Sequence, residues 1–205
     1  MGIGTLLVRA DASVAIGTGH VMRCLALAQA WQDAGGQAVF ASAKITDALR
    51  KRLAAESCDV AAISSPGGSF EDAAQTVALA RENKCDWVVV DGYAFGPQYQ
   101  QVLKAAGLKT LFVDDHGHAP PYSADVVLNQ NLTATRELYS DREGQTRLLL
   151  GTRYCLLRRE FADWREWQRE ISPVCRRLLV VMGGSDPENV TARVLEVLAA
   201  DEFEG

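Results

Sequence analysis

Short apolar runs alternate with segments of helical periodicity along most of this chain. In the first such segment, apolar residues recur every three or four positions from Val21 to Trp31, which predicts a helix, and Gly35 and Gly36 end it. Similar periodicity predicts helices over residues 47–56, 70–83, 97–106 and 158–170. The apolar runs predict strands over residues 5–11, 37–42, 60–64, 86–93, 109–115, 125–131 and 147–151. This alternation is typical of an α/β fold with a parallel sheet.

The same cycle begins again near the end of the chain. Residues 176–200 read RRLLVVMGGSDPENVTARVLEVLAA, a pattern that predicts a strand, a glycine turn and a helix. One strand with one helix cannot form a sheet layer of its own. We therefore expect residues 1–171 to form a complete α/β domain, and residues 172–205 to be the opening unit of a second, truncated domain.

Composition narrows the class of protein. The formal net charge is −5, from 21 basic and 26 acidic residues, which disfavours binding to nucleic acid or to anionic membranes. We expect no signal peptide before the first strand, because a charge follows after only a few apolar residues, and no apolar stretch approaches the length of a membrane span. The five cysteines are scattered without a CxxC pair, which is typical of a reduced cytoplasmic protein. We expect a small-molecule substrate.

Four polar clusters follow four of the expected strands. They are residues 17–20, 91–93, 114–115 and 129–131. In a doubly wound parallel sheet, ligands bind beyond the carboxyl ends of the strands, where these clusters would meet. The sequence therefore predicts a binding or catalytic site at this edge.

A dinucleotide cofactor is not expected at the first glycine loop. The GxGxxG pattern fails because Met22 occupies the position of the third glycine, and the second strand has no acidic residue at its end. We therefore expect neither a nicotinamide nor a flavin cofactor. A helix N-terminus still favours anions, so the loop could contact a phosphate without the full motif.

His20 allows two interpretations. It could simply cap or pack against the first helix. Alternatively, the positive end of that helix would disfavour an imidazolium and keep the ring neutral, so that it could accept a proton from water or a substrate hydroxyl.

The second glycine loop also allows two interpretations. Gly183, Gly184 and Ser185 could bring backbone N–H groups close to a pyrophosphate, with Asn189 facing the ligand from the following helix. The loop could also be a structural turn capped by Ser185 or Asp186. The stretch DDHGH at residues 114–118 mixes ligand types without a recognised spacing, so we expect no metal there.

Six motifs, in order, resemble a known family. They read RADASVAIGTGHVMRCLALA, VVVDGY, VDD, DVVLNQN, LLGTRYCLLRREF and VVMGGSDPENVT. In residues 9–198 the chain resembles the UDP-2,4-diacetamido-2,4,6-trideoxy-β-L-altropyranose hydrolases of pseudaminic acid biosynthesis. That family is related to MurG-like glycosyltransferases, and the resemblance implies their GT-B fold, with two Rossmann-like domains facing a cleft.

The resemblance also implies roles for individual residues. His20 matches the catalytic histidine, Asp91 and Tyr93 match sugar-side positions, and the loop from Gly183 to Asp186 matches the UDP grip. The expected substrate contacts within the matched motifs are Arg9, Gly17, Thr18, Gly19, Asp91, Tyr93 and Asn131, and the expected UDP contacts are Gly183, Gly184, Ser185 and Asn189. The family needs no metal or other cofactor. His116 and His118 lie outside its pattern and receive no role.

The implied reaction is an inverting hydrolysis. Water attacks the anomeric carbon, the C1–O bond breaks, and UDP leaves; His20 would activate the water as a carboxylate does in most inverting glycosidases. A charge-neutralised pyrophosphate leaves without a general acid. Because most of the second domain is missing from these 205 residues, we expect weak or no hydrolysis by this chain.

Two other functions remain open. A glycosyltransferase on the same scaffold would use His20 to activate an acceptor hydroxyl. A UDP-sugar-binding module would use the same pocket without catalysis.

Overall fold

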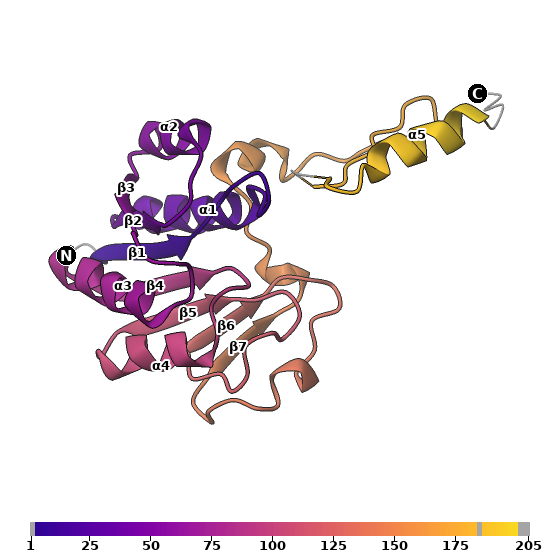
Figure 1. Ribbon diagram of the computed structural model, residues 1–205. Helices are drawn as coiled ribbons and strands as arrows, with labels where there is room; N and C mark the ends of the chain where they lie inside the picture. The colour runs from indigo at the N-terminus through magenta and orange to yellow at the C-terminus, as the bar shows by residue number, and fades with distance from the viewer. Residues whose placement is uncertain (1–2, 184–185, 201–205) are drawn as a thin grey trace.

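Seven parallel strands form the centre of the molecule, in the order β3-β2-β1-β4-β5-β6-β7 (Figure 1). The structure is a computed structural model that describes residues 3–183 and 186–200. The strands are β1 (Thr5–Ala10), β2 (Gln37–Ser42), β3 (Asp59–Ala62), β4 (Cys85–Asp91), β5 (Lys109–Val113), β6 (Val126–Asn129) and β7 (Arg147–Leu150). All seven predicted strands of the first part of the chain, and the parallel α/β class, are therefore confirmed.

Four helices cover the two faces of the sheet. They are α1 (Gly19–Asp33), α2 (Asp47–Ala55), α3 (Phe70–Glu82) and α4 (Pro97–Ala105). Apolar residues of α1 and α2 pack against one face, which includes Val8 and Phe40, and those of α3 and α4 pack against the other, which includes Leu7 and Phe112. The fold thus has three layers, because neighbouring strand residues point to opposite faces.

Local chemistry explains where two of these helices begin. The hydroxyl of Thr46 accepts a hydrogen bond from the N–H of Leu49 at the start of α2, and Ser69 does the same for Asp72 at the start of α3. Such side-chain caps pair N–H groups that have no partner within the helix.

The order of the strands locates a topological switch point. After β3 the chain returns to the other side of β1, so that β4 pairs with β1 in parallel and Ala10 lies opposite Asp91. In open α/β sheets the crevice at such a point is the usual ligand site. The carboxyl ends of β1 and β4 therefore lie together at the edge where the sequence predicts a site.

Two predicted elements are wrong. Residues 158–170 do not form an α-helix; only Arg159–Trp164 coil, as the 3-10 helix η3, and Trp164 and Trp167 remain exposed. The predicted strand before the second glycine turn, within residues 176–200, is not formed in the described chain, where Leu179 and Val181 are 84% and 67% exposed. Both patterns need a surface that buries their apolar residues: η3 contacts α1 but leaves its aromatic residues largely exposed, and the 178–182 segment pairs with no strand among the described residues.

The final predicted helix is present as α5 (Val190–Ala200). Figure 1 shows it beyond an extended segment that leads away from the sheet. The division at residue 171 remains a prediction, since the described residues after it form no sheet with α5.

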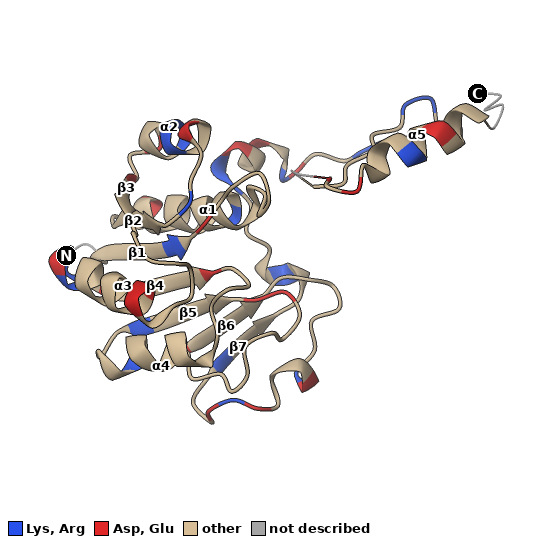
Figure 2. Cartoon of the chain, in the orientation of Figure 1, with Lys and Arg blue, Asp and Glu red and all other residues tan. Residues whose placement is uncertain are grey.

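The cysteines, the helix lengths and the charge distribution bear on the expectations from composition. All five cysteines lie in the described chain and are free thiols, three of them buried: Cys24, Cys58 and Cys85. Among residues 3–183 and 186–200, no helix combines the length and apolar character needed to cross a bilayer. Figure 2 shows basic and acidic residues interspersed along the fold.

Candidate active site

A buried carboxylate holds the ring of His20. His20 is the second residue of α1, and Asp91 is the last residue of β4. The Nδ1 atom lies 2.7 Å from Oδ1 of Asp91, which is fully buried, while His20 is 8% exposed. When Nδ1–H donates to this carboxylate, Nε2 of the neutral ring is left with a lone pair. The arrangement is that of an oriented general base.

Arg23 joins this pair to a second carboxylate, one helical turn after His20. Its Nε and Nη2 donate to Asp91 at 2.6 and 2.7 Å, and its Nη1 and Nη2 donate to Asp115 at 2.7 and 3.1 Å. Burial lowers the pKa of Arg23, but the hydrogen bonds to Asp91 and Asp115 outweigh this effect and leave the pKa raised. The guanidinium therefore stays cationic. Sequence analysis missed Arg23, although helical spacing places it on the face of His20.

Asp115 organises the outer part of the site. Its carboxylate accepts hydrogen bonds from the hydroxyl of Tyr93 at 2.9 Å and from Nδ2 of Asn131 at 3.1 Å. Burial tends to raise the pKa of Asp115, but Arg23, Tyr93 and Asn131 lower it overall. Asn131 directs its amide to Asp115, so in this structure it supports the site rather than lining its cavity.

All three histidines of the chain surround Tyr93. The ring centroids of His20, His116 and His118 lie 5.0, 5.2 and 5.6 Å from that of Tyr93. Tyr93 is 58% exposed, so it also reaches solvent. Gly92 precedes it with φ of +147°, and a Cβ there would lie 2.9 Å from the ring of Phe95. The glycine therefore lets β4 end with Asp91 turned inward and Tyr93 turned outward.

A cavity of about 300 Å³ opens beside the imidazole. Its lining combines the ionisable groups with apolar side chains: Asp11, Ala15, Ile16, His20, Asp91, Gly92, Tyr93, Ala94 and Phe95. His20 is thus not turned wholly into the core, and a small ligand has room next to it. The cavity does not contain the side chains of Arg9 or Asn131 among its lining residues.

The expected direct contact of Arg9 with substrate is wrong in this structure. Arg9 is fully buried, and its guanidinium donates to Asp72 at 2.8 Å twice and to Asp11 at 2.7 and 2.9 Å. Asp11, which sequence analysis did not single out, is the residue at the cavity. Arg9 and the N–H groups of Ala43 and Lys44 hold its carboxylate in place. Arg9 and Asp11 start from the same face of β1, and the difference arises because only Asp11 lies past the end of the strand.

The first glycine loop gives α1 its start. Gly17 has φ of +81°, a conformation that favours glycine, and its N–H donates to Ser13 O at 2.8 Å. Thr18 is the N-cap, yet its side chain makes no capping bond within the described residues. His20 is therefore not the cap of α1. Gly17, Thr18 and Gly19 border the site, but only Ala15 and Ile16 of this loop line the cavity together with His20.

Asp114 and Asp115 have different environments. Asp114 is 1% exposed and accepts hydrogen bonds from the N–H groups of His116 and Gly117 at 2.7 and 2.6 Å, which fold the loop after β5. Nδ1 of His118 lies 3.0 Å from Asp114 without the alignment of a hydrogen bond. Among residues 3–183 and 186–200, no three His, Cys, Asp or Glu residues are arranged to hold a metal ion.

The second glycine loop is described only in part. Gly184 and Ser185 lie outside the described residues. Gly183 has φ of +75°, and the N–H of Asn189 donates to Asp186 O at 2.9 Å. The Asp186 carboxylate accepts from the N–H groups of Val190 and Thr191, as in the capped-turn interpretation. Figure 1 shows α5 apart from the sheet.

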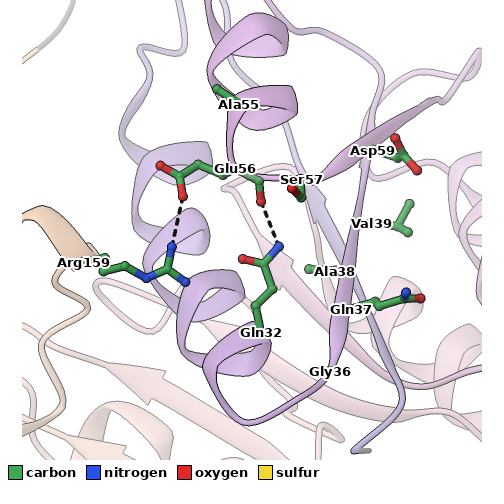
Figure 3. Close-up of a pocket in the computed structure, with 10 residues that line it drawn as sticks. All are labelled: Gln32, Gly36, Gln37, Ala38, Val39, Ala55, Glu56, Ser57, Asp59 and Arg159. Atoms are coloured by element: carbon green, nitrogen blue, oxygen red, sulfur yellow. Dashed lines mark hydrogen bonds and ion pairs between the residues drawn. The ribbon is translucent and has the colours of Figure 1, made fainter.

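A larger hollow lies at the opposite end of the sheet (Figure 3). Its volume is about 500 Å³, and residues of α1, β2 and the turn after α2 line it together with Arg159. Arg159 forms an ion pair with Glu56 in this hollow and another with Asp33 of α1. It contains no histidine, so the smaller cavity beside His20 is the better candidate for catalysis.

Comparisons with known proteins agree with the motifs. No family model matches the chain. A UDP-2,4-diacetamido-2,4,6-trideoxy-β-L-altropyranose hydrolase of Campylobacter jejuni is 27% identical over 94% of this chain and 65% of its own length. An uncharacterised protein, MJ1062 of Methanocaldococcus jannaschii, is 25% identical over 94% of this chain and 39% of its own length. The chain thus spans less than two thirds of either curated relative.

Solved structures with similar folds have low sequence identity. MurG of Acinetobacter baumannii is 14% identical, with a TM-score of 0.49 over 83% of this chain and 50% of that chain. HepE of Anabaena, solved in complex with UDP and glucose, is 15% identical, with a TM-score of 0.48 over 70% of this chain and 43% of that chain. The resemblance expected from the motifs is confirmed in this sense: over nearly its whole length, the chain is similar to a UDP-sugar hydrolase.

Proposed function

We propose that the chain provides the catalytic-base half of a nucleotide-sugar hydrolase. The substrate would be a UDP-linked 2,4-diacetamido-2,4,6-trideoxyhexose, cleaved at its anomeric C1–O bond with inversion, in the biosynthesis of pseudaminic acid. The observation that carries the proposal is the His20–Asp91 pair beside a cavity at the switch point of the sheet. The 27% identity to a hydrolase of this kind supports the same reaction.

In this mechanism Nε2 of His20 takes a proton from water as the water oxygen bonds to C1. The C1–O bond breaks, and its electron pair leaves with the UDP oxygen. Asp91 stabilises the imidazolium that forms and holds the ring in the required tautomer. The water and the leaving group are on opposite faces of the sugar, so the anomeric configuration inverts.

The cavity also suits the proposed sugar. Ile16, Ala94 and Phe95 provide apolar contact for the C6 methyl and the acetamido methyl groups. Asp11, fixed by Arg9 and two backbone N–H groups, can accept a hydrogen bond from an amide N–H or a hydroxyl. We assign UDP to the second glycine loop, through Gly183, Gly184, Ser185 and Asn189, in a two-domain GT-B arrangement; this assignment rests on the sequence resemblance.

The reaction can be followed by time-resolved NMR of the UDP-sugar in H₂¹⁸O with the intact protein, by which we mean this chain together with a complete second domain. We expect UDP and the inverted free sugar as first products, with the isotope in the sugar at C1. Isotope in the phosphate of UDP would contradict attack at C1. Transfer of the sugar to an added acceptor alcohol, without hydrolysis, would identify a glycosyltransferase instead.

A His20→Asn variant tests the role of the base. We expect turnover to fall by about 10²–10⁴-fold, the usual contribution of a general base, with UDP binding and thermal unfolding unchanged. Unchanged turnover would remove His20 from the mechanism. Binding of the UDP-sugar by the unchanged protein without any turnover would favour a binding module.

A further inference from the structure

Arg23 is placed to control the charge of the carboxylate that His20 contacts. Its guanidinium forms a two-point contact with Asp91: Nε donates to Oδ2 at 2.6 Å, and Nη2 donates at 2.7 Å to Oδ1, the oxygen that His20 also contacts. Asp91 is fully buried, and its other polar neighbour is the thiol of Cys24 at 3.3 Å. Solvent therefore does not screen the negative charge of Asp91, and Arg23 provides the positive charge that compensates it.

Ionisable groups from several elements surround the ring of His20. Asp91 and Arg23 contact or approach its Nδ1, at 2.7 and 3.4 Å. Asp11 shares the cavity with the ring, and Tyr93 packs edge-on against it. Asp115 lies beyond Arg23, and the two remaining histidines lie beyond Tyr93. Arg23 is the cation shared by Asp91 and Asp115, and its guanidinium donates hydrogen bonds to both carboxylates.

We infer that Arg23 is a positioning residue that keeps the Nε2 lone pair of His20 available, by neutralising Asp91 and fixing its orientation through Asp115. The inference rests on the proposed function for its catalytic meaning, but the state of the ring can be measured without substrate. Without Arg23, the uncompensated charge of the buried Asp91 would favour the uptake of a proton, either by His20 or by Asp91 itself.

Protonation of either group removes the lone pair of Nε2 that the proposed hydrolysis uses. If the proton goes to His20, the ring becomes an imidazolium paired with Asp91, and Nε2 has no lone pair. If it goes to Asp91, the carboxyl group donates to Nδ1, and the ring carries its proton on Nε2 instead. Either outcome leaves Nε2–H where the hydrolysis needs an acceptor.

The chain offers a graded set of variants. Arg23→Gln removes the charge, whereas Arg23→Lys keeps the charge but loses the fork that reaches both carboxylates. Arg52→Gln is the matched control, because Arg52 on α2 forms exposed ion pairs with Glu56 and Glu160, away from the site. The measurement is ¹⁵N NMR of imidazole-labelled protein across pH, with the His20 signals identified by their loss in His20→Gln.

In the unchanged protein and in Arg52→Gln, we expect the neutral ring with its proton on Nδ1. In Arg23→Gln we expect either the Nε2–H tautomer or an imidazolium under the conditions in which the unchanged protein shows the Nδ1–H tautomer. Arg23→Lys should restore part of the original signal. If Arg23→Gln unfolds, the His20 spectrum of Arg23→Lys is the test of the inference. In whichever variant is measured, a His20 spectrum identical to that of the unchanged protein would overturn the inference.

Kinetics of the intact protein separate this inference from the proposed function. In Arg23→Gln the acid limb of kcat/KM should move to higher pH, or kcat should fall by about 10²-fold or more at all pH values, with a smaller change in KM. Absence of hydrolysis in the unchanged protein with a complete second domain would refute the proposed function while leaving the NMR test intact. Hydrolysis with an unaltered pH profile and kcat in both Arg23 variants would refute the role of Arg23.

Discussion

The Nδ1 atom of His20 lies 2.7 Å from Oδ1 of Asp91, although 71 positions separate the two residues in the sequence. Each residue stands at the end of an element at the switch point, His20 where α1 begins and Asp91 where β4 ends. This one contact favours the neutral tautomer with its proton on Nδ1, which leaves the lone pair on Nε2. Four predictions follow from it and from the ionic groups around it.

Replacing the orienting carboxylate should abolish most of the activity. In Asp91→Asn the side-chain amide can donate to Nδ1, which places the ring proton on Nε2. We expect kcat to fall by about 10³–10⁴-fold with little change in KM, as in hydrolases whose orienting aspartate is replaced. Steady-state kinetics of the intact protein test this. Asp86→Asn, at an exposed position of the same strand, should retain full activity; an active Asp91→Asn variant would exclude this role.

Removing the hydroxyl of Tyr93 should affect binding more than catalysis. Tyr93→Phe loses the hydrogen bond to Asp115 but keeps the ring beside His20. Burial and the bond to Asp115 raise the pKa of Tyr93, so its hydroxyl remains protonated near neutral pH and can only donate or accept a hydrogen bond. We expect KM to rise about 5-fold, the equivalent of one hydrogen bond, with kcat within about 2-fold. A kcat loss of 100-fold would instead assign Tyr93 to the chemical step.

Stability should depend on pH through His118 and Asp114. The contact with Asp114 raises the pKa of His118, so its contribution is present below the unfolded value of about 6.5 and is lost as pH rises through the folded value. The pKa of Asp114 is lowered: burial opposes this, but His118, Tyr122 and backbone N–H groups prevail. Its contribution is present above the unfolded value of about 3.9 and is lost as pH falls.

Urea unfolding at pH 5.5 and 8.5 measures the histidine part of this dependence. The unchanged protein should lose stability over this interval relative to His118→Gln, whose slope with pH should be smaller. His116→Gln, which replaces the exposed neighbouring ring, should keep the original slope. Equal slopes in all three proteins would show that the His118–Asp114 contact does not contribute.

Asp72 should be one of the most sensitive positions for folding. Its buried carboxylate receives two hydrogen bonds from Arg9, and others from the N–H of Gly68 and the hydroxyl of Tyr99. Asp72→Asn removes one of the two charges that compensate Arg9. We expect the free energy of unfolding to fall by about 3 kcal/mol, the lower end for a broken buried pair, because Asp11 still contacts Arg9.

Denaturant titration measures this loss. The exposed Asp59, at the start of β3, provides the control, and Asp59→Asn should change the free energy of unfolding by less than about 0.5 kcal/mol. A similar small effect in Asp72→Asn would mean that Asp11 alone compensates Arg9.

The sequence determined the elements of this protein and the edge at which polar residues gather. Strand and helix periods are local properties of the chain, so the seven strands and α1 to α5 could be read from neighbouring residues. Because parallel strands end at one edge, His20, Asp91, Tyr93 and Asp115 could be assigned to a common region without knowledge of their contacts.

Only the tertiary structure decided what each polar side chain does there. Arg9 and Asp11 are both charged residues near the end of one strand, and Asp114 and Asp115 are adjacent acids after another. In each pair one residue is enclosed and the other reaches the site, a difference that the sequence does not indicate. The exposed apolar residues of 178–182 show the same limit, since a strand forms only beside a partner. Burial and ion pairing depend on groups tens of positions away, as Arg23 and Asp115 are, and local periodicity carries no information about which of them will meet.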